Sequence, residues 1–191
     1  MDKLVYKHTL GYLFLFTLLV SFSQKKFEPK ATSAQLSLEG KTLKGYTTNF
    51  DFGWEDVRRG WWEYARAFGT PLNMKTYYKV TVPSQINDGN VDIEIFTQTT
   101  DGNGGSDFFL GVENEKYDEQ ARTMILDFKK EFYIKDLVEQ IEKKQEKADD
   151  LSDEYRDSVL ETKKQELLNQ ISTIEKEIAQ LRDRIKAIEL M

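Results

Sequence analysis

The sequence predicts an α+β protein, in which a small two-layer β-α-β-β-β-α sandwich head is followed by a long helical tail of coiled-coil type. Three observations lead to this prediction. Several short stretches alternate apolar and polar residues, one stretch repeats apolar residues at the helical period, and Tyr117–Met191 contains neither Gly nor Pro. The head is expected over residues 36–133 and the tail over residues 134–191.

Residues 1–23 have the three-part plan of a secretory signal peptide. A short basic start precedes an apolar run over residues 10–20, and Ser21 and Ser23 supply small residues two positions apart. This run is too short to cross a bilayer of roughly 30 Å. We therefore expect cleavage before Gln24, with an uncleaved membrane anchor as the alternative.

The end of this leader, Ser21-Phe22-Ser23-Gln24, resembles the signal ends common in exported proteins of Bacteroidota. The resemblance covers the signal alone. It implies a periplasmic or extracellular location in a Gram-negative bacterium, associated with the cell envelope.

Charge and composition exclude several function classes. The chain has 27 basic and 33 acidic residues; loss of residues 1–23 removes two lysines and one aspartate, leaving 25 and 32, a net charge of −7. Such an acidic protein is a poor candidate for binding nucleic acid or an anionic membrane surface, so membrane contact is expected only through an uncleaved signal. The chain has no Cys, and its one histidine, His8, leaves with the leader. Thiol chemistry and histidine-based catalysis are therefore excluded from the processed protein.

The head begins after a polar lead over residues 24–35. Tyr46, Thr48, Phe50 and Phe52 alternate with polar residues, which is typical of a half-buried strand, and Leu36 and Leu38 suggest a short strand before it. Three more alternating stretches follow at residues 78–82, 91–95 and 108–112. They are joined by turn-forming Gly, Asn and Asp residues at 85–90 and 101–106.

A helix is predicted between the first strand and these three. One apolar stripe has the helical period and consists of Val57, Trp61, Tyr64, Ala65 and Phe68. Glu55 and Asp56 favour the positive end of the helix dipole, and Gly69 with Pro71 supplies a stop signal. Together with the first helical turns of the tail, this helix is expected to cover one face of the sheet.

The tail carries a heptad seam that is typical of a coiled coil. The seam residues are Leu167, Ile171, Ile174, Ile178, Leu181, Ile185 and Ile188. Isoleucine at the a positions favours a parallel pair of helices, so we expect an oligomerisation seam and a homo-oligomer. The alternative is intramolecular, with the seam packing back on residues 117–141.

A break in the tail is predicted near residues 148–153. The apolar pattern before it is two residues out of phase with the seam after it, and a run of lysines gives way there to a run of carboxylates. Asp150 or Ser152 could cap a new helix. These features predict a helical hairpin, whereas one continuous kinked helix is the alternative.

No motif of the head indicates catalysis or a cofactor. The loop 101–107 places oxygen ligands at alternate positions, as a calcium loop does, but Val112 stands where an EF-hand needs glutamate. The same residues are ordinary hairpin turn residues, so neither a metal nor a cofactor is expected. Paired carboxylates such as Asp92 and Glu94 are explained by a solvated sheet face.

The aromatic residues of the predicted helix are its most unusual feature. Trp62 lies outside the core stripe, with Arg58 and Arg66 four residues before and after it, which predicts a cation–π ladder on the helix flank. With Trp54, these residues form a candidate partner-binding surface, because exposed Trp and Arg dominate binding hot spots. The alternative is a stacked Trp that shields the edge of the core.

The sequence thus predicts an exported, envelope-associated binding or scaffolding protein without enzymatic activity, with an interaction head and a helical spacer or oligomerisation tail. Its partner is expected to be a protein or a second copy of itself. The alternative is a carboxylate-based hydrolase that acts on an envelope polymer.

Overall fold

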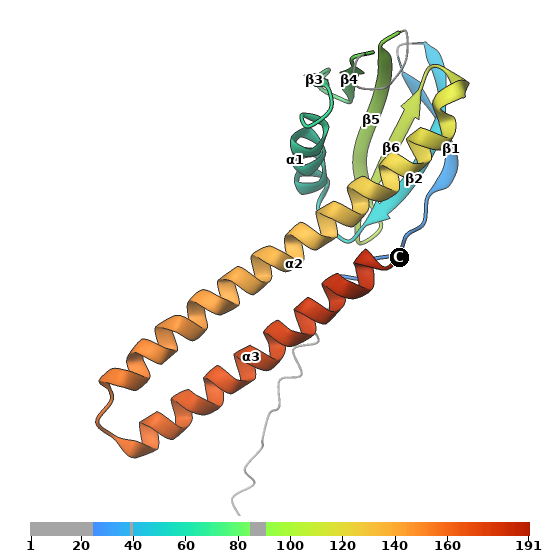
Figure 1. Cartoon of the computed structure of the whole chain (residues 1–191). Helices are drawn as coiled ribbons and strands as arrows, with labels where there is room; N and C mark the ends of the chain where they lie inside the picture. The colour runs from blue at the N-terminus through green and yellow to red at the C-terminus, as the bar shows by residue number, and fades with distance from the viewer. Residues whose placement is uncertain (1–24, 39, 85–90) are drawn as a thin grey trace, which may run out of the picture.

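A computed structural model describes residues 25–38, 40–84 and 91–191. The predicted leader (1–23) and the predicted turn at 85–90 lie outside the described residues. The described part forms an antiparallel six-stranded sheet and three α-helices, of which the last two are long and packed together (Figure 1). The predicted α+β class with a helical tail is confirmed.

The sheet has the strand order β1-β2-β6-β5-β4-β3. Its strands are β1 (Thr32–Leu38), β2 (Lys41–Phe50), β3 (Thr70–Asn73), β4 (Tyr78–Val82), β5 (Ile93–Gly102) and β6 (Gly105–Val112). Every neighbouring pair is antiparallel; all are joined by short connections except β2 and β6, which are brought together from distant parts of the chain. The turn between β5 and β6 is Asn103-Gly104, and Gly104 has a φ of 85°, a left-handed conformation that glycine adopts readily.

The two outermost strands extend the predicted order to β-β-α-β-β-β-β-α-α. β1 begins at Thr32, so the prediction of a polar lead through residue 35 is wrong at its end. β3 was not predicted, because Pro71 reads as a helix stop; proline is tolerated there since β3 is an edge strand. β1 lengthens the short strand that Leu36 and Leu38 suggested, whereas β3 is stabilised by pairing with β4, which no local pattern reveals.

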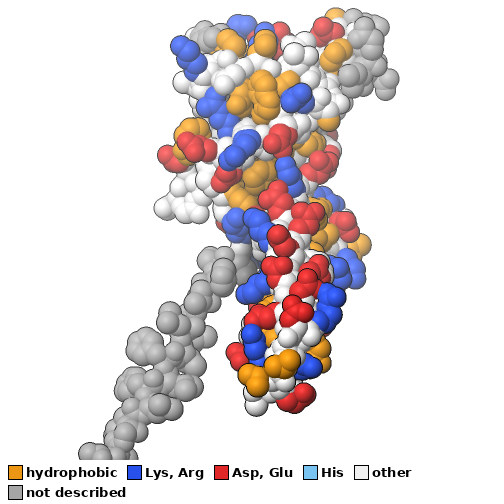
Figure 2. Space-filling model, turned by 90° about the vertical axis from the view of Figure 1, so that its left-hand side faces the viewer, with side chains coloured by type: hydrophobic (Ala, Val, Ile, Leu, Met, Phe, Trp, Pro, Cys, Tyr) orange, Lys and Arg blue, Asp and Glu red, His pale blue; other side chains and the backbone are white. Residues whose placement is uncertain are grey.

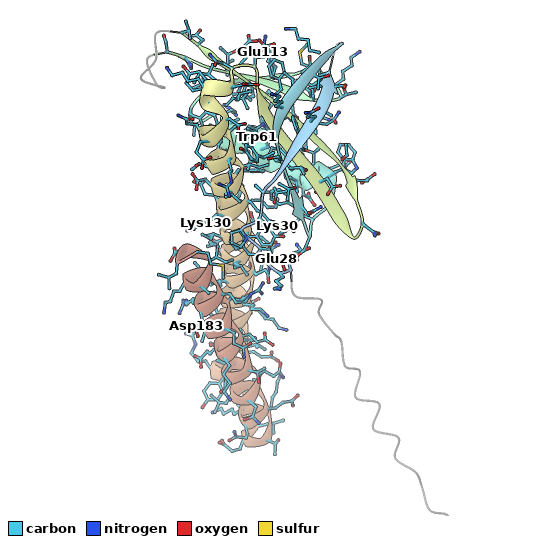
Figure 3. All side chains as sticks on the ribbon, turned by 90° about the vertical axis from the view of Figure 1, so that its right-hand side faces the viewer. Glu28, Lys30, Trp61, Glu113, Lys130 and Asp183 are labelled. Carbon is cyan, nitrogen blue, oxygen red and sulfur yellow. The ribbon has the colours of Figure 1, made fainter. Side chains whose placement is uncertain are left out.

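One face of the sheet is covered by α1 (Trp54–Ala65) and the first turns of α2 (Asp118–Asp157) (Figure 1). Trp61 is completely buried inside the head, with its ring centroid 5.2 Å from that of Phe108 and 5.1 Å from that of Phe128 (Figure 3). Gly60 lets the two helices approach closely, because a Cβ atom at this position would overlap the ring of Phe132. The predicted helix and its apolar stripe are thus confirmed.

Helix α2 joins the head to the tail without interruption. A short 3-10 helix, η1 (Glu115–Tyr117), precedes it, and α2 then runs for 40 residues. Its buried residues from Ala121 to Tyr133 pack against the head, whereas Ala148 packs against α3. The predicted boundary between residues 133 and 134 therefore falls inside one continuous helix.

The tail is a hairpin of α2 and α3 (Glu161–Glu189), as Figure 1 shows. The predicted break near 148–153 is wrong, because α2 continues to Asp157 and the chain turns at residues 158–160. Ser152 does not cap a new helix; its hydroxyl donates to the Ala148 carbonyl oxygen at 2.8 Å within α2. Ala148 is itself buried against Ile174 and Ile178, so helical packing outweighs the change of charge.

Among the described residues, no helix combines the length and the apolar character that crossing a membrane requires.

Candidate functional site

A shallow groove on the head brings together most of the predicted partner-binding residues. This aromatic groove has a volume of about 400 Å³ and lies between α1 and the β3–β4 edge. It is lined by Trp54, Glu55, Arg58, Arg59, Trp62, Asn73 and Tyr78. Figure 2 shows hydrophobic side chains gathered on this face of the head, with charged side chains around them.

Helical spacing and one strand position the aromatic rings of the groove. Trp54, Arg58 and Trp62 follow one another at intervals of four residues, so they share a flank of α1. Trp62 is half-buried, and its ring centroid lies 5.3 Å from that of Tyr78 at the start of β4. The groove is therefore built by tertiary contact between α1 and the edge of the sheet.

Arg58 is held in place by the β3–β4 connection. Its Nη2 donates to Asn73 Oδ1 at 2.8 Å and to the Lys75 carbonyl oxygen at 2.7 Å. The same Asn73 oxygen accepts from the Lys75 backbone N–H at 2.9 Å, where Lys75 adopts a φ of 73°. The guanidinium carbon lies 4.8 Å from the centroid of the Tyr78 ring. Arg58 is thus held by two hydrogen bonds and by contact with an aromatic ring.

The predicted cation–π ladder on Trp62 is wrong. Arg58 stacks on Tyr78 rather than on Trp62, and Arg66 is exposed at the C-cap of α1 and does not line the groove. Trp54 and Arg58 lie beside Trp62 as the spacing implied. Asn73 was missed, because nothing local distinguishes it from an ordinary turn asparagine.

A second hollow, the charged cleft, lies between α1 and α2 and has a volume of about 360 Å³. Its acidic residues are Asp56, Glu63, Asp136 and Glu139, and its basic residues are Lys25, Arg59 and Lys135. Ion pairs join Asp56 to Arg59 at 2.5 Å, Glu63 to Lys135 at 2.6 Å and Asp136 to Lys25 at 3.4 Å. The hydrogen bond with Glu63 raises the pKa of Lys135. The cleft is therefore lined by ion pairs.

Glu28 and Glu115 are not suited to act as the general acid of glycoside hydrolysis. A general acid must hold its proton near neutral pH, which requires a raised pKa. The pKa of Glu28 is lowered by its hydrogen bond with Lys26, and that of Glu115 by its hydrogen bond with Lys44. Both shifts are opposite to what a proton donor needs.

Lys129 is a buried cation that the sequence did not single out. Only 4 % of it is exposed, and its Nζ donates to Thr48 Oγ1 at 3.1 Å. Burial lowers the pKa of Lys129, although Asp51 and Glu28 oppose this effect. Nearby, the Tyr133 hydroxyl accepts from the Asp51 backbone N–H at 3.1 Å, and burial raises the pKa of Tyr133 to about 12.

The predicted oligomerisation seam packs on α2 of the same chain. Leu167, Ile174, Ile178, Leu181 and Ile188 are buried, whereas Ile171 and Ile185 are half-buried. Ile174 and Ile178 contact Ala148, and Leu181 and Ile188 join the core of the head. This is the intramolecular alternative; the partner surface on α2 includes Tyr133, Leu137 and Ile141 and extends beyond residue 141 to Ala148 and Leu151.

The loop 101–107 forms the end of β5, a turn and the start of β6. Asp107 there accepts a hydrogen bond from the Asn49 side chain. No cluster of three or more His, Cys, Asp or Glu side chains suited to a metal ion occurs in the part of the chain that the structure describes.

The aromatic groove holds three of the four predicted partner-binding residues, and the charged cleft holds ion pairs between different elements. No family model matches this chain, and comparisons with curated proteins and with solved structures likewise give no match.

Proposed function

We propose that this chain is an exported, envelope-associated binding or scaffolding protein without enzymatic activity. Its head contacts a protein partner through the aromatic groove, and its helical hairpin acts as a spacer. The observation that carries the proposal is the groove itself, where the Trp62 ring packs at a tilt of 49° against Tyr78 while Arg58 donates hydrogen bonds to Asn73 and Lys75.

The construction of the groove favours binding in two ways. Partly exposed Trp and Arg side chains supply large contact areas and are enriched where interfaces derive most of their energy. Because Arg58 and Trp62 are held by contacts within the head, these side chains have less conformational entropy to lose when a partner binds. The open, shallow shape suits a protein surface better than an enclosed small molecule.

The hairpin suits the role of a spacer because its two helices support each other. The 29 residues of α3 span about 43 Å at 1.5 Å per residue. Lys144 and Glu177 form an ion pair between the helices at 2.5 Å, and Glu154 and Lys163 form another at 2.6 Å near the turn. Val159 and Leu160 are exposed at the far end.

The alternative function, a carboxylate-based hydrolase, is not favoured by a specific observation. Its natural location is the charged cleft, where several carboxylates converge. Because Asp56, Glu63 and Asp136 are each engaged by a cation, the cleft is better explained as a contact between α1, α2 and the N-terminal segment.

Trp62→Ala tests the proposal directly. A photo-reactive amino acid at Glu55, an exposed residue that lines the groove, is used in the source organism to capture the partner. The affinity of this partner for wild-type and Trp62→Ala protein is then measured by calorimetry. We expect at least a tenfold loss of affinity, since truncating a hot-spot Trp costs about 2 kcal/mol or more. The melting temperature should change little, because Trp62 is only half-buried.

Leu160→Ala is the matched control, because it removes an exposed apolar side chain at the other end of the molecule. It should leave the affinity unchanged. A large fall in melting temperature for Trp62→Ala without a loss of affinity would return Trp62 to a purely structural role and contradict the proposal.

A further inference from the structure

The two edges of the sheet differ in how they are protected against further pairing. Natural edge strands are commonly short, charged, bulged or interrupted by proline, because their free N–H and C=O groups would otherwise recruit another strand. β3 fits this description, with four residues and Pro71. β1, at the other edge, has seven residues, Thr32–Leu38, without a charge or a proline, and it pairs with β2 without a bulge.

The pairing register shows which backbone groups of β1 are unpaired within the sheet. Only two residues separate Leu38 from Lys41, so this flanking pair exchanges hydrogen bonds, as do the pairs Leu36–Leu43 and Ala34–Gly45. Ser33, Gln35 and Ser37 therefore direct their N–H and C=O groups away from β2. In Figure 1, β1 forms the margin of the head.

The side chains of β1 continue an apolar surface on the sheet face opposite the helices. Leu43, Tyr77, Phe96 and Phe109 form a cluster there, and it is extended by Ala34, Leu36 and Leu38 of β1. These three β1 residues are only half-buried, so the cluster is incomplete along this margin. A strand added to β1 would cover it if alternate side chains of that strand were apolar.

We propose that β1 pairs with β1 of a second copy of this chain, in antiparallel orientation about a two-fold axis at Gln35, so that two sheets join into one. β1 is complementary to itself in this register. Ser33 lies opposite Ser37 of the second copy and Gln35 opposite Gln35, so the residues with outward N–H and C=O groups bond to one another. Ala34 lies opposite Leu36 of the second copy, which joins the two apolar clusters across the axis.

The charge distribution also favours a second copy at this edge. The chain has a net charge of −6, so most contacts between two copies bring like charges together. β1 contributes no charge to such a contact. A two-fold axis gives a closed dimer in which the β1 edge of each copy is covered, rather than an open fibre. The proposal uses a surface separate from the aromatic groove and does not depend on the function of that groove.

Gln35→Lys and Gln35→Glu test the pairing, with the oligomeric state measured by analytical ultracentrifugation of the chain without residues 1–23. Gln35 is exposed in the single chain, so neither change should lower the melting temperature. Each variant alone places like charges opposite each other and should raise the dimer dissociation constant about fivefold. An equimolar mixture of the two should restore association, because lysine then faces glutamate.

Thr70→Lys on β3 is the matched control and should leave the dissociation constant unchanged. Hydrogen exchange gives an independent readout: the amides of Ser33, Gln35 and Ser37 should exchange more slowly as protein concentration rises. A wild-type monomer at all concentrations, a dimer unaffected by Gln35→Lys, or protection that appears only with a different protein would each overturn the proposal.

Discussion

At the scale of single residues, Lys129 is the least expected feature of the head. It lies on the face of α2 that packs against β2, and Thr48 is its hydrogen-bond acceptor. Thr48 in turn donates to the Lys30 carbonyl oxygen at 2.7 Å, so the buried cation is linked to the N-terminal segment. Figure 3 shows Glu28 and Lys30 of that segment beside α2, at the junction of head and hairpin. Lys129 thus helps fix this segment, although burying its charge costs free energy.

Replacing Lys129 by Met should stabilise the protein at neutral pH by roughly 1 kcal/mol, because the penalty for burying a charge disappears while the packing volume remains. The pKa of Lys129 in the folded state is lowered from 10.5. Between that lowered pKa and 10.5 the unfolded chain binds more protons than the folded one, so wild-type stability rises with pH in this window. The advantage of Lys129→Met over wild type should therefore shrink as pH approaches 10.5.

Urea unfolding of both proteins at several pH values measures this difference. Exposed Lys143 on the same helix provides the control, since Lys143→Met should give a pH-independent difference close to zero. A destabilised Lys129→Met protein at neutral pH would mean that the bond to Thr48 outweighs the cost of burial.

At the scale of elements, the seam of α3 packs on its own chain rather than on another copy. A three-residue connection at 158–160 returns α3 along α2, so its apolar seam meets α2 at high effective concentration. The end of α3 is also fastened to the head. Arg184 donates to the Lys25 carbonyl oxygen at 2.7 Å, and Lys130 Nζ to that of Glu189 at 2.7 Å.

Cross-linking distinguishes this hairpin from an exchange of α3 between chains. The chain lacks cysteine, so Lys144→Cys with Glu177→Cys introduces the only two thiols, at positions that form an interhelical ion pair. A short bis-maleimide reagent should join them within one chain at every protein concentration. Lys144→Cys with Glu166→Cys, about three helical turns out of register, should react poorly. Covalent dimers from the first variant would contradict the intramolecular hairpin.

At the scale of the whole molecule, the N-terminal segment holds head and hairpin together. Phe27 is buried and meets the Tyr133 ring edge-on at 5.5 Å, and the Lys26 backbone N–H donates to Asp51 Oδ2 at 2.7 Å. Lys25 Nζ lies 3.6 Å from the centroid of the Phe52 ring. These contacts join Lys25, Lys26 and Phe27 to residues of the head and of α2.

The sequence predicts cleavage before Gln24. Mass spectrometry of the protein recovered from its source should then find an N-terminal peptide that begins at Gln24. Fractionation should place this form outside the cytoplasm. A chain that retains residues 1–23 and remains with the membrane would instead support the uncleaved anchor.

The sequence by itself determined the α+β class, helix α1 and the helical tail. Each depends on local periodicity: Val57, Trp61 and Ala65 repeat at the helical period and are all buried. The predicted alternating stretches fall on β2, β4, β5 and β6, although consecutive residues of β5 and β6 are buried on both faces of the sheet. The phase slip in the tail correctly indicated a hairpin. The two apolar patterns are out of phase, and they can pack against each other only if the chain turns back between them.

Only the tertiary structure decided where the hairpin turns, what α3 packs against and which side chains form the groove. The turn lies at 158–160 because Ala148 and Leu151 pack against α3. That contact extends α2 past the place where its run of lysines gives way to a run of carboxylates. Arg58 reaches Tyr78 and Asn73 because α1 packs beside the β3–β4 edge. Such contacts join residues far apart in the sequence, and their free energy depends on the neighbours that folding supplies rather than on any pattern within a single segment.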